Sequence, residues 1–247
     1  MTDLDWVVLD VDGVMINVEE SYDLAVKKTA EKILKDLGVE EDISLEKVRD
    51  FRAKGKFGDD YRVTEGLVLA KSGDDGDQLI EELPRGAGIS WIRNRTKLSI
   101  DESRVRNIFD RSYLGAENSV SEEGLWKQEK PLIDTSLLDK TAKKFNLGFV
   151  TGRSREELEL ASRILDYSFS NAVTRDDFLK PDPEALTSLV KDATGVYLGD
   201  TFNDKLLVEN YNEETAGVFE FVLIDSDTSA NQVLRYLISG GDDSGNK

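Results

Sequence analysis

The chain has 247 residues, a formal net charge of −18 and no cysteine or histidine, which excludes disulfides, thiolate nucleophiles, imidazole chemistry and Cys/His zinc sites. The excess of acidic side chains argues against nucleic acid as a partner, because phosphate backbones attract basic surfaces. Any catalysis must therefore use carboxylates, hydroxyls, lysine or arginine, and any metal must be a hard cation held by oxygen atoms, with Mg²⁺ as the first candidate.

The first predicted strand covers residues 6–10, where an apolar run ends at Asp10. Gly13 predicts the turn that follows. Two carboxylates, those of Asp10 and Asp12, would then lie at the carboxyl edge of a sheet, where open α/β folds bind their ligands. Because nearby like charges repel, the pair implies a bound cation or a raised pKa.

Residues 17–130 show helical periodicity, and nothing between Asn17 and Gly124 is typical of a strand. Helices are predicted over residues 22–37, 45–51, 64–71 and 101–114. A glycine-containing loop is predicted over residues 54–61, and a surface turn over residues 74–77. We therefore expect an all-helical domain over residues 17–130, inserted after the first strand of a core domain formed by residues 1–16 and 131–240.

From Pro131 onward, predicted helices and strands alternate. The helices are expected over residues 137–145, 154–165, 183–191, 203–211 and 229–238. The strands are expected over residues 147–150, 172–173, 196–198 and 218–224. Ser154 and Glu157 predict a capping box, and Asp182 predicts a helix N-cap. The alternation indicates an α/β fold with a mostly parallel, Rossmann-like sheet and helices on both faces, followed by a disordered tail over residues 241–247.

Three further segments carry polar residues at predicted strand ends or in a rigid loop. Thr151 and Gly152 precede a helix N-terminus, whose N–H groups favour an anion. Lys180 is followed by Pro-Asp-Pro, and a lysine held in such a stiff loop can neutralise a phosphoryl oxygen or a carboxylate. Asp200 and Asp204 are two acids that suit a hard divalent cation. Taken alone, each segment also has an ordinary structural interpretation.

Together and in this order, the four segments resemble the signature motifs of the haloacid dehalogenase (HAD) superfamily. Those motifs are a DxD strand, a Thr or Ser strand end, a lysine and a GDxxxD segment, and the helical block matches the position of that superfamily's cap. Within the cap and its borders, the sequence is similar to a microbial subgroup of phosphatases associated by sequence with imidazoleglycerol-phosphate enzymes. The segments that carry this second similarity are residues 10–18, 20–22, 54–61 and 113–115.

The resemblance implies Asp10 as the nucleophile that forms an aspartyl-phosphate. It implies Asp12 as the acid that protonates the leaving alcohol and then takes a proton from the attacking water. Mg²⁺ would be held by Asp10, by the main-chain carbonyl of Asp12 and by Asp200. Asp204 would either bind the metal through water or support its ligands.

Further roles follow for the residues expected to bind the substrate. The resemblance implies that Thr151, the backbone of Gly152 and Lys180 hold the phosphoryl oxygens. In the cap, three basic residues flank or lie in the loop around Phe57, and we expect them to contact the organic part of the substrate. These cap residues are Lys54, Lys56 and Arg62. For Arg153, a contact with substrate and a solvent-facing position at the helix start are both open.

Asp12 favours a particular reaction class. Superfamily dehalogenases lack an acid at this position because halide leaves without a proton, and P-type pumps carry threonine there. The expected function is therefore Mg²⁺-dependent hydrolysis of small-molecule phosphomonoesters. A phosphomutase, which uses the same two acids, and a non-catalytic phosphate-binding or signalling protein are the alternatives.

Location and assembly are expected from simpler features. The N-terminal residues carry no secretory or lipidation signal. No apolar run in the sequence is long enough to cross a bilayer. We therefore expect a cytoplasmic protein without a membrane partner, present as a monomer or a homodimer.

Overall fold

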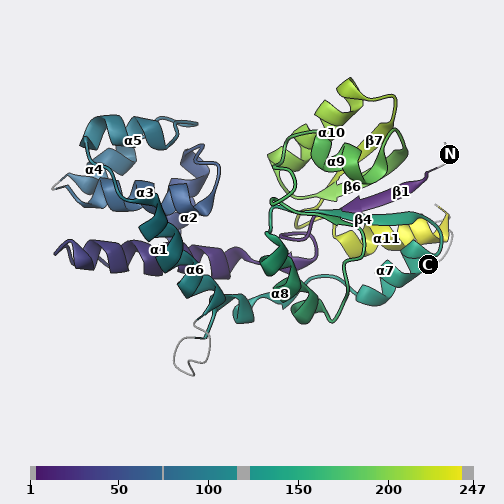
Figure 1. The fold of residues 1–247 in the computed structure, drawn as a ribbon, viewed down its shortest axis with the longest axis horizontal. Coiled ribbons are helices and arrows are strands. Elements are labelled where there is room, and N and C mark those ends of the chain that lie inside the picture. Colours follow the sequence, from purple (N-terminus) through teal and green to yellow (C-terminus); the bar gives the residue numbers. More distant parts are fainter. Residues whose placement is uncertain (1–3, 74, 116–122, 241–247) are drawn as a thin grey trace. The chain divides into compact units, whose positions relative to one another are not determined.

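The computed structural model describes residues 4–73, 75–115 and 123–240, and it divides into two compact units. The α/β unit comprises Met1–Val18 and Glu129–Lys247, and the helical unit comprises Glu19–Gln128 (Figure 1). The tail predicted over residues 241–247 lies outside the described residues. No helix in the described ranges is both long enough and apolar enough to span a membrane.

The α/β unit is built on a five-stranded sheet in which all neighbouring strands are parallel. In spatial order the strands are β5 (Ala172–Val173), β4 (Asn146–Val150), β1 (Trp6–Leu9), β6 (Thr194–Gly199) and β7 (Val218–Leu223). Leu9, at the end of β1, lies opposite Phe149 of β4 and Leu198 of β6. The strand order reverses between β1 and β6, and open α/β sheets form their ligand crevice at such a switch point.

Helices cover both faces of this sheet because side chains alternate between the faces along each strand. Val7 and Leu9 pack into an apolar cluster with α7 (Thr135–Ala142), α8 (Arg155–Leu165) and α11 (Ala230–Ser239). Val8 packs on the opposite face with α9 (Glu184–Val190) and α10 (Phe202–Glu214). Figure 1 shows α9 and α10 on one side of the sheet and α7 and α11 on the other. The predicted Rossmann-like α/β architecture is thus confirmed.

A two-stranded antiparallel ribbon joins the two chain segments at the border of the α/β unit. It pairs β2 (Ile16–Asn17) with β3 (Lys130–Pro131). The main-chain N–H of Leu132 also donates to the carbonyl of Met15 at 2.8 Å. This ribbon was not predicted, since strands of two residues carry no periodicity that a sequence can reveal.

The helical unit contains no strand longer than an isolated bridge among its described residues. Its helices are α1 (Glu19–Asp36), α2 (Leu45–Lys54), α3 (Asp60–Lys71), α4 (Gly76–Glu82), α5 (Ile89–Thr96) and α6 (Glu102–Leu114), followed by the 3₁₀ helix η1 (Leu125–Gln128). Helix α3 is buried along most of its length. Two buried acids have arginine partners: Asp23 pairs with Arg49 and Arg52, and Glu65 pairs with Arg62 and Arg93. The predicted all-helical character of this inserted unit is therefore confirmed for its described residues.

Several predicted boundaries are wrong. Helix α3 begins at Asp60, four residues earlier than expected, because the Asp59 side chain accepts the N–H of Arg62 and caps the helix. The turn expected over residues 74–77 is in part the start of α4, and Asp74 lies outside the described residues. Helix α5 was not predicted. Both helices are short and polar, so their apolar periodicity is weak.

Capping was predicted with mixed success. The Ser154–Glu157 capping box is confirmed, since each side chain accepts the other residue's N–H, at 2.8 and 3.2 Å. At α9 the N-cap is Pro183 rather than Asp182. Asp182 nevertheless accepts the N–H of Glu184 at 3.0 Å. Helix α7 begins at Thr135, two residues before the predicted start, because Asp134 caps it.

Candidate active site

Three carboxylates meet at the carboxyl edge of the sheet, beside the switch point. Asp10 directly follows β1, Asp200 directly follows β6, and Asp204 lies in the first turn of α10. One carboxylate oxygen from each lies within 4.8 Å of the other two. Gly13 leaves room for this cluster: its φ is +70°, and a Cβ there would lie 1.9 Å from Oδ2 of Asp200. Any other residue at position 13 would push Asp200 aside.

The local electrostatics are unfavourable for so many negative charges. Burial raises the pKa of Asp10 well above its usual range, and the Asp204 and Asp12 carboxylates raise it further against the effect of Lys180. Burial, with a contribution from Asp204, raises the pKa of Asp200 to about 6. A cluster of oxygen ligands whose ionisation the protein opposes is a suitable site for a hard divalent cation. The residues present therefore fit Mg²⁺.

Lys180 compensates part of this charge from the loop before α9. Its Nζ lies 2.9 Å from Oδ1 of Asp10 and 2.6 Å from Oδ1 of Asp204. Burial alone would lower the pKa of Lys180, but the two carboxylates raise it above its ordinary value. The ammonium therefore stays charged beside Asp10. The Lys180–Pro181 peptide bond is cis.

Asp204 is fully buried and has donors on both oxygens. Oδ1 accepts from Lys180 and lies 3.0 Å from the Tyr197 hydroxyl, and Oδ2 accepts from the N–H and hydroxyl of Thr201. Burial alone would raise the pKa of Asp204, but Lys180 and the hydrogen bonds hold it below the ordinary value. With these partners, Asp204 is better suited to holding Lys180 than to binding a metal directly.

Tyr197 was not identified from the sequence. It is fully buried in β6, and its hydroxyl lies within donating distance of the Val150 carbonyl (3.1 Å) and of Asp204. Burial and the Asp204 charge raise the pKa of Tyr197 well above 10, so the hydroxyl remains a donor. Nothing in the sequence distinguishes this tyrosine from an ordinary core residue of a strand.

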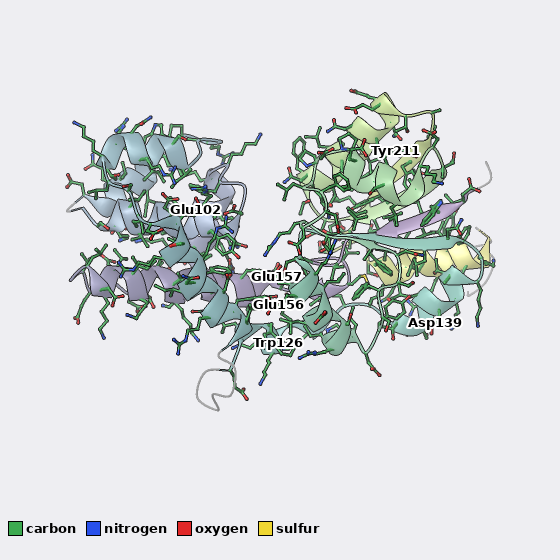
Figure 2. The ribbon with its side chains drawn as sticks, viewed as in Figure 1. Glu102, Trp126, Asp139, Glu156, Glu157 and Tyr211 are labelled. Atoms are coloured by element: carbon green, nitrogen blue, oxygen red, sulfur yellow. The ribbon has the colours of Figure 1, made fainter. Side chains whose placement is uncertain are left out.

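The Asp12 carboxylate is held by the buried side chain of Arg153. Arg153 is 0% exposed, and its Nε donates to Oδ1 of Asp12 at 2.7 Å. Its other two nitrogens donate to Oε2 of Glu129 (2.7 Å) and to the main-chain carbonyl of Glu157 (3.2 Å). Figure 2 shows Glu157 at the start of α8, on the helix that follows the Arg153 loop. The solvent-facing alternative for Arg153 is therefore wrong.

Thr151 and Gly152 form the turn between β4 and α8. Thr151 is 1% exposed, and its hydroxyl oxygen accepts the N–H of Arg153 at 3.1 Å. The hydroxyl hydrogen has no acceptor within the described part of the chain. A Cβ added at Gly152 would meet no atom within 4 Å, so there is open space beside this backbone. The turn thus offers a hydroxyl and a helix N-terminus to an anion.

The three predicted cap residues have different surroundings in the helical unit. Lys54 donates to the carbonyls of Ile80 (3.0 Å) and Glu81, and so caps the C-terminal end of α4. Arg62 pairs with Glu65 and Glu102. Lys56 is exposed, and although its main-chain N–H donates to the carbonyl of Ala87 at 2.9 Å, its side chain has no hydrogen-bond or ion-pair partner among residues 4–73, 75–115 and 123–240. Of the three, Lys56 alone has a side chain that is not engaged by its own unit.

The chain matches no family model and no curated protein. Among solved structures, Phosphatase Tt82 from Thermococcus thioreducens is 45% identical, with a TM-score of 0.87 over 96% of this chain and 100% of that one.

Two more distant structures share the fold alone. A HAD-superfamily hydrolase of subfamily IA from Geobacter sulfurreducens PCA is 19% identical, with a TM-score of 0.51 over 96% of each chain. A protein from Thermotoga maritima named as a beta-phosphoglucomutase is 16% identical, with a TM-score of 0.50 over 96% of this chain and 99% of its own. The predicted resemblance to the haloacid dehalogenase superfamily is confirmed, and the chain belongs to that superfamily as a phosphatase.

Proposed function

We propose that the protein hydrolyses small-molecule phosphomonoesters with Mg²⁺, through an aspartyl-phosphate formed on Asp10. The observation that carries this proposal is the position of Asp10: buried at the end of β1, 2.9 Å from the Lys180 ammonium and within the three-carboxylate cluster. A carboxylate in this setting can attack an electrophile whose negative charge is neutralised beside it.

The metal would be held by Asp10, by Asp200 and by the main-chain carbonyl of Asp12. The all-oxygen donor set and the raised pKa values of Asp10 and Asp200 support this assignment. When bound, Mg²⁺ neutralises the carboxylates and polarises the phosphoryl oxygens. Asp204 is proposed as the residue that positions Lys180, because both of its oxygens already accept hydrogen bonds.

The protein's own groups would perform two phosphoryl transfers. In the first, an oxygen of Asp10 bonds to phosphorus, the bond from phosphorus to the alcohol oxygen breaks, and Asp12 gives that oxygen its proton. In the second, Asp12 takes a proton from water as the water oxygen attacks phosphorus and releases Asp10. Lys180, the Thr151 hydroxyl and the Gly152 N–H would bind the phosphoryl oxygens throughout.

The organic part of the substrate would be recognised by the helical unit. Lys56 is the proposed contact, since its ammonium is exposed and unengaged, whereas Lys54 and Arg62 have partners in the fold. Lys54 and Arg62 are instead proposed to stabilise the helical unit through these partners. The cytoplasmic location and the monomeric or dimeric state stay predictions.

The test is a panel of phosphomonoesters assayed for release of inorganic phosphate with and without Mg²⁺. We expect Mg²⁺-dependent release that is lost in Asp10→Asn and inhibited by fluoroberyllate, a mimic of the phosphoryl group. Asp166→Asn, an exposed aspartate at the end of α8, is the matched control and should keep full activity. Interconversion of sugar phosphates without net release would identify a phosphomutase instead. A stable phosphoprotein without turnover would identify a signalling role.

A further inference from the structure

One buried guanidinium joins the proposed acid to the segment that leads back into the sheet. Arg153 donates from Nε to Asp12 and from Nη2 to Glu129, at 2.7 Å in both cases. The Glu129 side chain is itself fully buried. Two charge-assisted hydrogen bonds from one planar group fix the orientation of both carboxylates.

The two carboxylates lie at the two ends of the ribbon. Asp12 belongs to the tight turn before β2, where Gly13 N–H donates to the Ile16 carbonyl at 2.9 Å. Glu129 immediately precedes β3, which pairs with β2. Arg153 therefore connects the outgoing and the returning chain segments from a third element, the loop before α8.

We propose that Arg153 is a positioning residue that holds the Asp12 carboxyl in its proton-transfer orientation, and that Glu129 holds Arg153 for this task. The inference rests on the proposed function, because it requires Asp12 to be the acid. Oδ1 of Asp12 is engaged by Arg153, and Oδ2 has no hydrogen-bond partner among the described residues. Oδ2 is thus the oxygen that carries the transferred proton.

The chemistry of the leaving group separates this role from a general structural one. An alkoxide is a poor leaving group, so breaking its bond to phosphorus needs a proton delivered from a well-placed acid. A dinitrophenolate leaves without a proton. A misplaced Asp12 must therefore slow attack on an alkyl phosphate and barely affect attack on a dinitrophenyl phosphate.

The experiment compares kcat/KM for an alkyl phosphate and for 2,4-dinitrophenyl phosphate, because kcat/KM reports the steps up to phosphoryl transfer to Asp10. In Arg153→Met we expect the alkyl value to fall by about 100-fold or more and the dinitrophenyl value by less than about 5-fold. Arg153→Lys should recover part of the alkyl activity. Glu129→Gln, which keeps an acceptor for Nη2, should show a smaller loss of the same selective kind.

Controls separate positioning from folding. Arg155→Met removes an exposed arginine two residues away and should change neither value. If Arg153→Met does not fold, the double variant Arg153→Met/Glu129→Leu removes both buried charges together, and it should show the same selective loss. Inhibition by inorganic phosphate should stay within about 3-fold of the wild type in each variant.

Two results would overturn the inference: an equal loss on both substrates, or no selective loss on the alkyl phosphate in either the single or the double variant. A wild-type protein that releases phosphate from neither substrate would instead refute the proposed function, without reference to any variant.

Discussion

Replacing Asp200 with asparagine should stabilise the metal-free protein at neutral pH and abolish its Mg²⁺-dependent activity. Burial and the neighbouring Asp204 raise the pKa of Asp200 from 3.8 to about 6, so the fold opposes the charge that the metal requires. Asparagine keeps the shape of the side chain and removes the charge. Stability and activity therefore change in opposite directions.

The size of the effect follows from that pKa. The rise from 3.8 to about 6 corresponds to about 3 kcal/mol. Asp200 is more accessible than Asp10 or Asp204, so solvent screening reduces this to about 1–2 kcal/mol. For a chain of this length the midpoint of thermal unfolding should rise by roughly 2–8 °C.

The sign of the pH dependence is fixed by the direction of the pKa change. Because the folded-state pKa lies above the unfolded value, the contribution of Asp200 to stability is fully present below 3.8 and is lost as the pH rises through about 6. The stability difference between Asp200→Asn and the wild type should thus be largest at pH 7 and nearly vanish at pH 4.

The assay is thermal unfolding of both proteins in a chelator and in Mg²⁺, over this pH range. Mg²⁺ should stabilise the wild type and leave Asp200→Asn unchanged, while phosphate release falls by about 100-fold or more. Asp166→Asn serves as the exposed control. The reasoning is refuted if Asp200→Asn is less stable than the wild type at pH 7 in chelator, or if the difference does not shrink toward acid.

Three further sets of substitutions test other parts of the structure. Lys180→Met leaves two buried carboxylates uncompensated and should lower the free energy of unfolding by about 3–5 kcal/mol at pH 7, with part regained toward acid pH. Chemical denaturation at two pH values measures this loss of stability, and the variant should also lose phosphate release. Gly13→Ala should raise the Mg²⁺ concentration for half-maximal activity about 10-fold or more, whereas Gly38→Ala, which has a similar positive φ and no atom within 4 Å, should cost only stability. Lys54→Met should lower the free energy of unfolding by about 0.5–1.5 kcal/mol and keep KM, while Lys56→Met should raise KM for the true substrate and keep stability; the reverse pattern would contradict both assignments.

The strand-end acids could be placed from the sequence because a parallel sheet imposes their location. Short apolar runs over residues 6–9 and 196–198 identify β1 and β6, and the residues that follow parallel strands must meet at the carboxyl edge of the sheet. Asp10 and Asp200 follow these two strands, and they meet because β1 and β6 are neighbours. The helical insertion could be recognised in the same way, from its long amphipathic first helix.

The partners of individual polar groups could not be predicted, because tertiary packing sets them. Arg153 is followed by a helix start, which is typical of a solvated residue, and only the fold brings Asp12 and Glu129 to it. The sequence around Tyr197 predicts an ordinary core residue, and only the fold brings its hydroxyl within hydrogen-bond distance of Asp204. The short polar helices of the cap were missed since weak periodicity was their only local signal.

The most direct test of the proposed mechanism is chemical trapping of the phosphorylated residue. Protein quenched during turnover of a phosphomonoester and treated with borohydride carries a reduced side chain wherever an aspartyl-phosphate stood, and peptide mass spectrometry locates it. We expect the modification at Asp10, dependent on Mg²⁺ and absent from Asp10→Asn. Rapid phosphate release with no trapped residue, or trapping at a different carboxylate, would contradict the proposal.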